Sequence, residues 1–105
     1  MSVKISLEEI QITINDWITN HGGYWSPLAM LSAIMEEIGE LAREINHLEG
    51  YKPKKSEEDE VKIGEELADI LYALVCIANY YKIDLSTQLE NVINKYTKRN
   101  SIRFI

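Results

Sequence analysis

Two short acidic stretches lie inside segments that are otherwise apolar, and they constrain this chain more than any other feature. They are residues 36–42 (EEIGELA) and residues 65–71 (EELADIL). Each has two acids, an apolar residue, a small residue, a third acid and two apolar residues. Burying an unpaired carboxylate is costly, so both segments need a compensating partner. We expect that partner to be a divalent metal ion.

Capping signals and helical spacing predict an all-α chain of four helices with no strand. Ser6 and Glu9 form a capping-box pattern, and Gly22-Gly23 ends the first helix. Ser26-Pro27 starts the second helix, and Asp84 or Ser86 caps the fourth. The polar segment 49–60 predicts a loop, with the third helix starting at Ser56. The predicted helices cover residues 6–21, 27–48, 56–81 and 85–99.

Apolar residues at steps of three and four predict that the second and third helices pack together. The expected core stripe of the second helix is Leu31, Ile34, Ile38, Leu41, Ile45 and Leu48. That of the third helix is Ile63, Leu67, Ile70, Leu71, Leu74 and Ala78. Residues 70–78 are apolar on all sides, which indicates a central helix or a subunit interface.

The acids take matching positions beside these two stripes. At about 100° per residue, Glu37 and Glu40 occupy the same angles on their helix as Glu66 and Asp69 do on theirs. Antiparallel packing would turn all four toward one cleft, where Gly39 lets a backbone or substrate come close. Glutamates at this spacing usually lie on a solvated helix face, but their repetition within apolar helices favours a site.

Four converging carboxylates suit a hard cation. Mg²⁺ prefers octahedral oxygen ligands, keeps several waters and bridges to substrate phosphates; Mn²⁺ is the expected substitute. Without a metal the carboxylates would repel one another and raise some of their pKa values. Glu36 points further outward and could assist the metal or polarise a water, whereas Glu65 resembles a solvated acid.

Bulk properties exclude several classes of protein. The 105 residues suit one domain, spanning 1–105, and the net charge of -6 argues against a nucleic-acid binder. The longest apolar run, 70–78, is far shorter than the roughly 18 residues of a membrane span. Cys76 is the single cysteine and the N-terminus lacks a signal-peptide apolar region, which fits a cytoplasmic protein.

The combined motif resembles the MazG-like all-α nucleoside triphosphate pyrophosphohydrolases. Their pattern, Glu-Glu-x-x-Glu followed by Glu-x-x-Asp, is matched at residues 36–40 and 66–69. The neighbouring GELA at 39–42 and KYxxR at 95–99 agree, and the resemblance covers about residues 17–103. It implies a four-helix bundle completed by oligomerisation into a homodimer or homotetramer. It also implies Mg²⁺-dependent hydrolysis of a standard or modified nucleoside triphosphate to monophosphate and pyrophosphate, as in the house-cleaning of unwanted nucleotides.

The resemblance also implies roles for individual residues. The metal ligands would be Glu37, Glu40, Glu66 and Asp69, and Glu36 would complete the catalytic set. Lys95 and Arg99 are the candidates for phosphate contact, although a solvated basic face explains them equally well. Trp25 could stack on the base, as could Tyr24, whereas Trp17 fits core packing better. Asn79 could reach the sugar or base, or cap a neighbouring chain.

Three alternatives stay open. Phosphoribosyl-ATP pyrophosphohydrolase shares the chemistry and differs in substrate. A di-iron ferritin-like protein needs two Glu-x-x-His motifs, and only Glu44-Ile45-Asn46-His47 supplies one, since Ile18 precedes His21. A non-enzymatic helical interaction module would release no pyrophosphate, and replacing Glu37 or Asp69 by alanine would not destabilise it.

Overall fold

The structure, a computed structural model, describes residues 4–51 and 57–103. Its helices are α1 (Leu7–Thr19), α2 (Pro27–Tyr51), α3 (Glu57–Tyr80) and α4 (Leu85–Arg103). No strand occurs in these two ranges, so the all-α prediction is confirmed. The predicted loop over 49–60 is too long, because α2 continues to Tyr51 and α3 has begun at Glu57. The rest of that predicted loop, 52–56, lies outside the described residues.

Short-range signals set the helix ends. The Ser6 hydroxyl accepts a hydrogen bond from the Glu9 amide at 3.1 Å, and the Glu9 carboxylate accepts one from the Ser6 amide at 3.4 Å. This is the predicted capping box. Gly22 and Gly23 have φ of 104° and 87° after α1, a conformation that glycine adopts without steric cost. The Asp84 carboxylate accepts from the Ser86 amide at 3.1 Å, which confirms the cap of α4.

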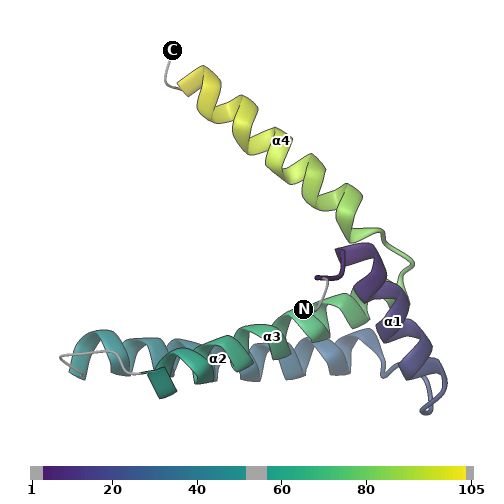
Figure 1. Ribbon diagram of the computed structural model, residues 1–105, viewed down its shortest axis with the longest axis horizontal. Coiled ribbons are helices and arrows are strands. Elements are labelled where there is room, and N and C mark those ends of the chain that lie inside the picture. The colour runs from purple at the N-terminus through teal and green to yellow at the C-terminus, as the bar shows by residue number, and fades with distance from the viewer. Residues whose placement is uncertain (1–3, 52–56, 104–105) are drawn as a thin grey trace.

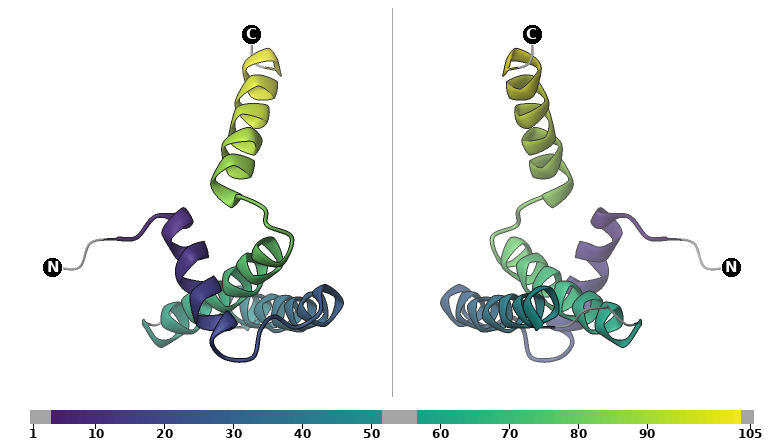
Figure 2. Two further views of the ribbon diagram at one scale, coloured as in Figure 1. Left: turned by 90° about the vertical axis from the view of Figure 1, so that its right-hand side faces the viewer. Right: turned by 90° about the vertical axis from the view of Figure 1, so that its left-hand side faces the viewer.

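The chain has an open arrangement, in which α2 and α3 lie side by side and α1 crosses one end of the pair (Figure 1). A small core forms at that end, where Ile18 of α1, Met30 of α2 and Cys76 of α3 are buried together. From the junction after α3, α4 leads away from the other helices, as the turned views also show (Figure 2). The site must therefore be sought on the α2–α3 pair and its α1 end.

The α2–α3 seam differs from the predicted core stripes. Residues that are buried or half-buried recur at steps of three and four on both helices. On α2 they are Pro27, Met30, Ile34, Glu37, Leu41, Glu44 and Leu48. On α3 they include Ile63, Glu66, Ile70, Ala73 and Ile77. This spacing is that of two helices packed along a narrow shared stripe.

Several residues expected in the core are instead exposed. On α2, Leu31, Ile38 and Ile45 keep 46%, 49% and 42% of their surface accessible. On α3, Leu67, Leu71 and Leu74 keep 53%, 50% and 44%. The prediction was wrong for these positions because each helix carries a second apolar face, and one chain covers only the face along the seam.

Candidate functional site

Two of the predicted metal ligands occupy seam positions. Glu37 and Glu66 are half-buried among the residues that join α2 to α3, whereas Glu40 and Asp69 are exposed beside them. The Oε2 atom of Glu66 is buried and has no hydrogen-bond partner in the described part of the chain. A buried carboxylate oxygen without a partner is costly, which is the problem that the sequence pattern posed.

Contacts along the seam define an antiparallel register in which each step along α2 matches a step back along α3. The matching pairs are Met30 with Cys76 in the core, Ala33 with Ala73 in a shared pocket wall, and Glu44 with Lys62 in an ion pair of 3.2 Å. The same register sets Glu37 level with Asp69 and Glu40 level with Glu66. The two halves of the motif are thus level with each other across the seam.

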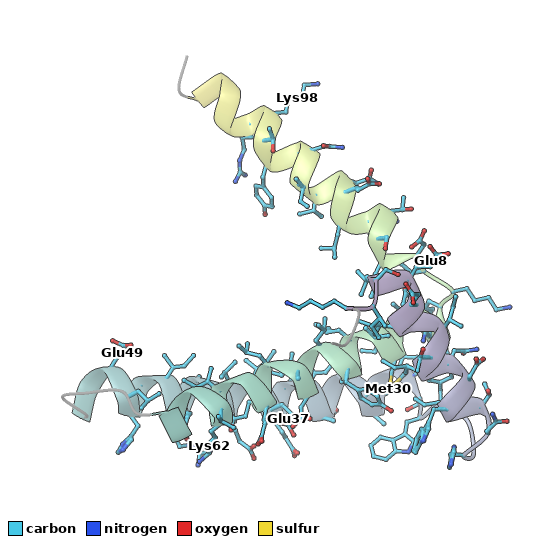
Figure 3. The ribbon with its side chains drawn as sticks, in the orientation of Figure 1. Glu8, Met30, Glu37, Glu49, Lys62 and Lys98 are labelled. Atoms are coloured by element: carbon cyan, nitrogen blue, oxygen red, sulfur yellow. The ribbon has the colours of Figure 1, made fainter. Side chains whose placement is uncertain are left out.

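The other acids of the motif contribute to the electrostatic environment of Glu37. Burial raises the pKa of Glu37 above its ordinary value, and the negative charges of Glu40, Asp69, Glu66 and Glu36 raise it further. We call these five residues the acidic cluster. Glu37 lies midway along the α2–α3 pair (Figure 3). The repulsion means that the cluster favours a proton or a cation in its midst.

The chemistry of the cluster fits a hard divalent cation. Its donors are all carboxylate oxygens, the ligand type of Mg²⁺ and Mn²⁺, and one of them is buried without a partner. Within residues 4–51 and 57–103, no three acidic, histidine or cysteine side chains stand as a ready-made metal site. Binding would therefore require the carboxylates to move closer together, which a cation's charge would favour.

An aromatic pocket of about 270 Å³ opens beside the cluster. Its aromatic walls are Trp17, His21, Tyr24, Trp25 and Tyr72. The rings of Trp17 and His21 are stacked with centroids 4.1 Å apart, and the Nδ1 of His21 lies 2.6 Å from the carbonyl oxygen of Trp17. The pocket can therefore accept a flat ligand that stacks on aromatic rings.

The pocket and the acidic cluster share the same two helices. Ala33 of α2 and Ala73 of α3 line the pocket, and each is four residues from an acid, Glu37 and Asp69 respectively. Four residues make about one helical turn, or about 6 Å along the axis. The pocket wall and the carboxylates are thus about one helical turn apart along both helices.

Sequence reasoning found part of this pocket and missed part. Trp25, the predicted base-stacking residue, lines it and is 69% exposed, and Tyr24 lines it too. Trp17, assigned to the core, is 56% exposed and forms a wall, so that assignment was wrong. His21 was assigned only to a helix end. Because it is four residues after Trp17, the two side chains share one helix face, and this spacing could have revealed His21 as part of the pocket wall. Tyr72 was read only as part of an apolar run.

The structure does not bring the other predicted binding residues to this site. Asn79 faces α1, where its Oδ1 accepts from Gln11 Nε2 at 2.9 Å and its Nδ2 donates to the Gln11 carbonyl oxygen at 2.9 Å. Lys95 and Arg99 are exposed on α4, with the Arg99 guanidinium 4.7 Å from the centre of the Tyr96 ring. Since α4 leads away from the α2–α3 pair, these basic residues and the acidic cluster of one chain are separate (Figure 1).

Comparisons with known proteins agree with the motif and the fold. The family model of the MazG nucleotide pyrophosphohydrolase domain matches residues 25–104. YpjD of Bacillus subtilis is 42% identical over 100 residues, which cover 94% of this chain and 90% of YpjD.

Two crystal structures resemble the fold. That of YPJD from Bacillus subtilis, a candidate pyrophosphatase, is 44% identical with a TM-score of 0.77, covering 91% of this chain and 98% of that one. That of the Bacillus-conserved MazG protein, a nucleotide pyrophosphohydrolase, is 39% identical with a TM-score of 0.74, covering 91% and 93%. No helix in the described ranges is long and apolar enough to cross a membrane.

Proposed function

The chain belongs to the MazG nucleotide pyrophosphohydrolase family, and from this premise we propose that it hydrolyses a nucleoside triphosphate to the monophosphate and pyrophosphate with Mg²⁺. The substrate is a standard or a modified nucleotide, and Mn²⁺ substitutes for Mg²⁺. One observation carries the proposal: an aromatic pocket lies one helical turn from five clustered carboxylates on the same two helices. A base in the pocket would direct its phosphates along the seam.

The acids of the cluster have two different roles in this proposal. Glu37, Glu40, Glu66 and Asp69 would hold the cation, which would orient the phosphate oxygens and neutralise their charge. Glu36 is exposed at the edge of the cluster, where it can accept a proton from the attacking water. Water adds to the α-phosphorus, the bond from that phosphorus to the bridging oxygen breaks, and pyrophosphate leaves with that oxygen.

A second chain completes the site in this proposal. Lys95 and Arg99 lie away from the acids of their own chain, so their contact with substrate phosphates requires a partner's cluster. The exposed apolar residues of α2 and α3, with Leu89, Val92 and Tyr96 of α4, supply the surface for a homodimer or homotetramer. We assign the assembly to the cytoplasm.

Pyrophosphate release tests the proposed function. Purified protein is incubated with a panel of standard and modified nucleoside triphosphates and phosphoribosyl-ATP, with Mg²⁺ or with a chelator. We expect equal amounts of monophosphate and pyrophosphate, only with metal. Glu40→Gln and Asp69→Asn should abolish release while circular dichroism shows unchanged helix, and Glu65→Gln, outside the cluster, should retain it.

The same panel separates the alternatives. Release from phosphoribosyl-ATP alone would identify that substrate in place of nucleoside triphosphates. Release of orthophosphate, or full activity in either cluster variant, would refute the assigned chemistry. No release from any substrate at any metal concentration would favour a helical interaction module.

A further inference from the structure

Gln11 is a buried polar side chain on α1, with 9% of its surface exposed. Its Nε2 donates to the Asn79 side chain at 2.9 Å and to the Ile83 carbonyl oxygen at 2.8 Å. Its Oε1 accepts from the Leu85 amide at 3.0 Å, and its own carbonyl oxygen accepts from Asn79 Nδ2 at 2.9 Å. We call these four hydrogen bonds the Gln11–Asn79 clasp. Together they use the nitrogen and the oxygen atom of both side-chain amides, those of Gln11 and Asn79.

The clasp closes over the junction between α3 and α4. After α3, Lys82 takes a φ of 57°, and the Ile83 amide donates back to the Ala78 carbonyl oxygen at 2.8 Å. This left-handed ending reverses the chain direction. Leu85 opens α4, and its amide is one of those that a helix start leaves without an intrahelical acceptor. Gln11 supplies that acceptor from another helix, so one side chain binds both sides of the junction.

The rest of α4 has little other support. Its packing in the chain is mainly against α1, and every side chain from Thr87 to Arg99 is exposed. Arg99 lies fourteen residues beyond Leu85, or about 21 Å along the helix axis. A change of about 10° at the base would therefore move the region of Arg99 by about 4 Å. Because α4 leads away from the other helices (Figure 1), a change of direction at its base is amplified along its length.

The clasp also touches the aromatic pocket. Asn79 lies within hydrogen-bonding reach of the Tyr24 phenol, and Tyr24 lines the pocket and donates to Asn15 Oδ1 at 2.7 Å. The base of α4 and the pocket thus share a polar network. Asn79 thus links the base of α4 to Tyr24 in the wall of the aromatic pocket.

We propose that Gln11 is a positioning residue that sets the direction of α4 and thereby places Lys95 and Arg99 for phosphate contact. The first part of this proposal, that the clasp sets the direction of α4, does not depend on the proposed function. The effect on phosphate contact rests on the proposed function. Two measurements separate these parts.

Hydrogen exchange tests the first part. Gln11→Met removes the three side-chain bonds at nearly constant volume, and Gln88→Met, at the chain's other glutamine on the exposed surface of α4, is the matched control. In Gln11→Met we expect the amides of residues 83–90 to exchange about tenfold faster, as the loss of one net hydrogen bond predicts. Gln88→Met should match the wild type. Unchanged exchange in Gln11→Met would overturn the proposal.

A double-mutant cycle tests the second part. Gln11→Met and the paired change Lys95→Ala/Arg99→Ala should each lower kcat/KM, mainly by raising KM, and the combined variant should be no worse than Lys95→Ala/Arg99→Ala. This non-additivity would not arise from general loss of stability. Fully additive losses would overturn the role in phosphate contact. A wild type that releases no pyrophosphate would refute the proposed function, while exchange still decides the role of the clasp.

A second variant tests the clasp if Gln11→Met does not fold. If Gln11→Met loses its helical signal, Asn79→Ala replaces it, because this variant keeps the bonds from Gln11 to Ile83 and Leu85. A smaller rise in exchange, about threefold, is then expected over residues 83–90. Wild-type exchange in a folded Asn79→Ala variant would contradict the clasp.

Discussion

Gly39 offers a test in which stability and activity should move in opposite directions. It lies within α2 beside Glu40, and nothing stands within 4 Å of the point where a Cβ atom would lie. Its φ is not among the positive values of the chain, so alanine fits the backbone. Gly39→Ala should therefore raise the free energy of unfolding by about 0.8–1 kcal/mol, because alanine loses less backbone entropy in a helix.

Activity should fall in the same variant. We propose that the triphosphate approaches α2 closely at Gly39, where a methyl group would hold it away from the acidic cluster. A displacement of about 1 Å can cost about a hundredfold in rate, so we expect kcat/KM to fall at least tenfold. Urea denaturation followed by circular dichroism measures the first effect, and pyrophosphate release at low nucleotide concentration measures the second.

Gly64→Ala is the matched control. Gly64 is also within a helix with open space around its Cβ position, and its neighbour Glu65 is outside the acidic cluster, whereas Gly39 directly precedes Glu40 of that cluster. It should gain similar stability and keep wild-type activity. If Gly39→Ala keeps full activity, the close approach is refuted; if it loses stability, the open space around Gly39 is covered in solution and the reasoning fails.

Two further predictions concern the cluster and the pocket. The folded chain binds the Glu37 proton more tightly than the unfolded chain does, because the pKa of Glu37 is raised on folding. In the presence of a chelator, the free energy of unfolding should therefore fall as pH rises above about 4.5, until Glu37 is ionised. Urea denaturation at a series of pH values should show this slope; Glu37→Gln should flatten the slope, and Glu65→Gln should leave it unchanged. Trp25→Ala should raise the nucleotide KM about tenfold with kcat retained, because one base stack is lost, whereas Trp25→Phe should stay near wild type in steady-state kinetics.

The features that sequence predicted well depend on neighbours along the chain. The capping box of Ser6 and Glu9, the glycine ending of α1 and the cap at Asp84 all act within a few residues. The acidic motif was also readable, because antiparallel packing of two helices with matching patterns leaves few ways to arrange its acids. The charges that raise the pKa of Glu37 come from the acids of both halves of the motif.

The features that sequence missed depend on which of several partners a side chain meets. Leu31 and Ile34 are both apolar and three apart, but only Ile34 lies in the seam, since α2 has two apolar faces. The hydrogen-bond partner of Asn79, Gln11, is 68 residues away in the sequence. The direction of α4 depends on that distant contact, so no local pattern could have shown where Lys95 and Arg99 lie.

Manganese binding tests the central claim most directly, because Mn²⁺ bound to protein loses the sharp electron paramagnetic resonance signal of the free ion. Wild type and Asp69→Asn are titrated with Mn²⁺ without nucleotide, because a triphosphate would bind Mn²⁺ by itself and remove the same signal. We expect the wild type to remove free Mn²⁺ from solution and Asp69→Asn to bind it at least about tenfold more weakly. Equal binding by the two proteins would contradict a metal site in the acidic cluster.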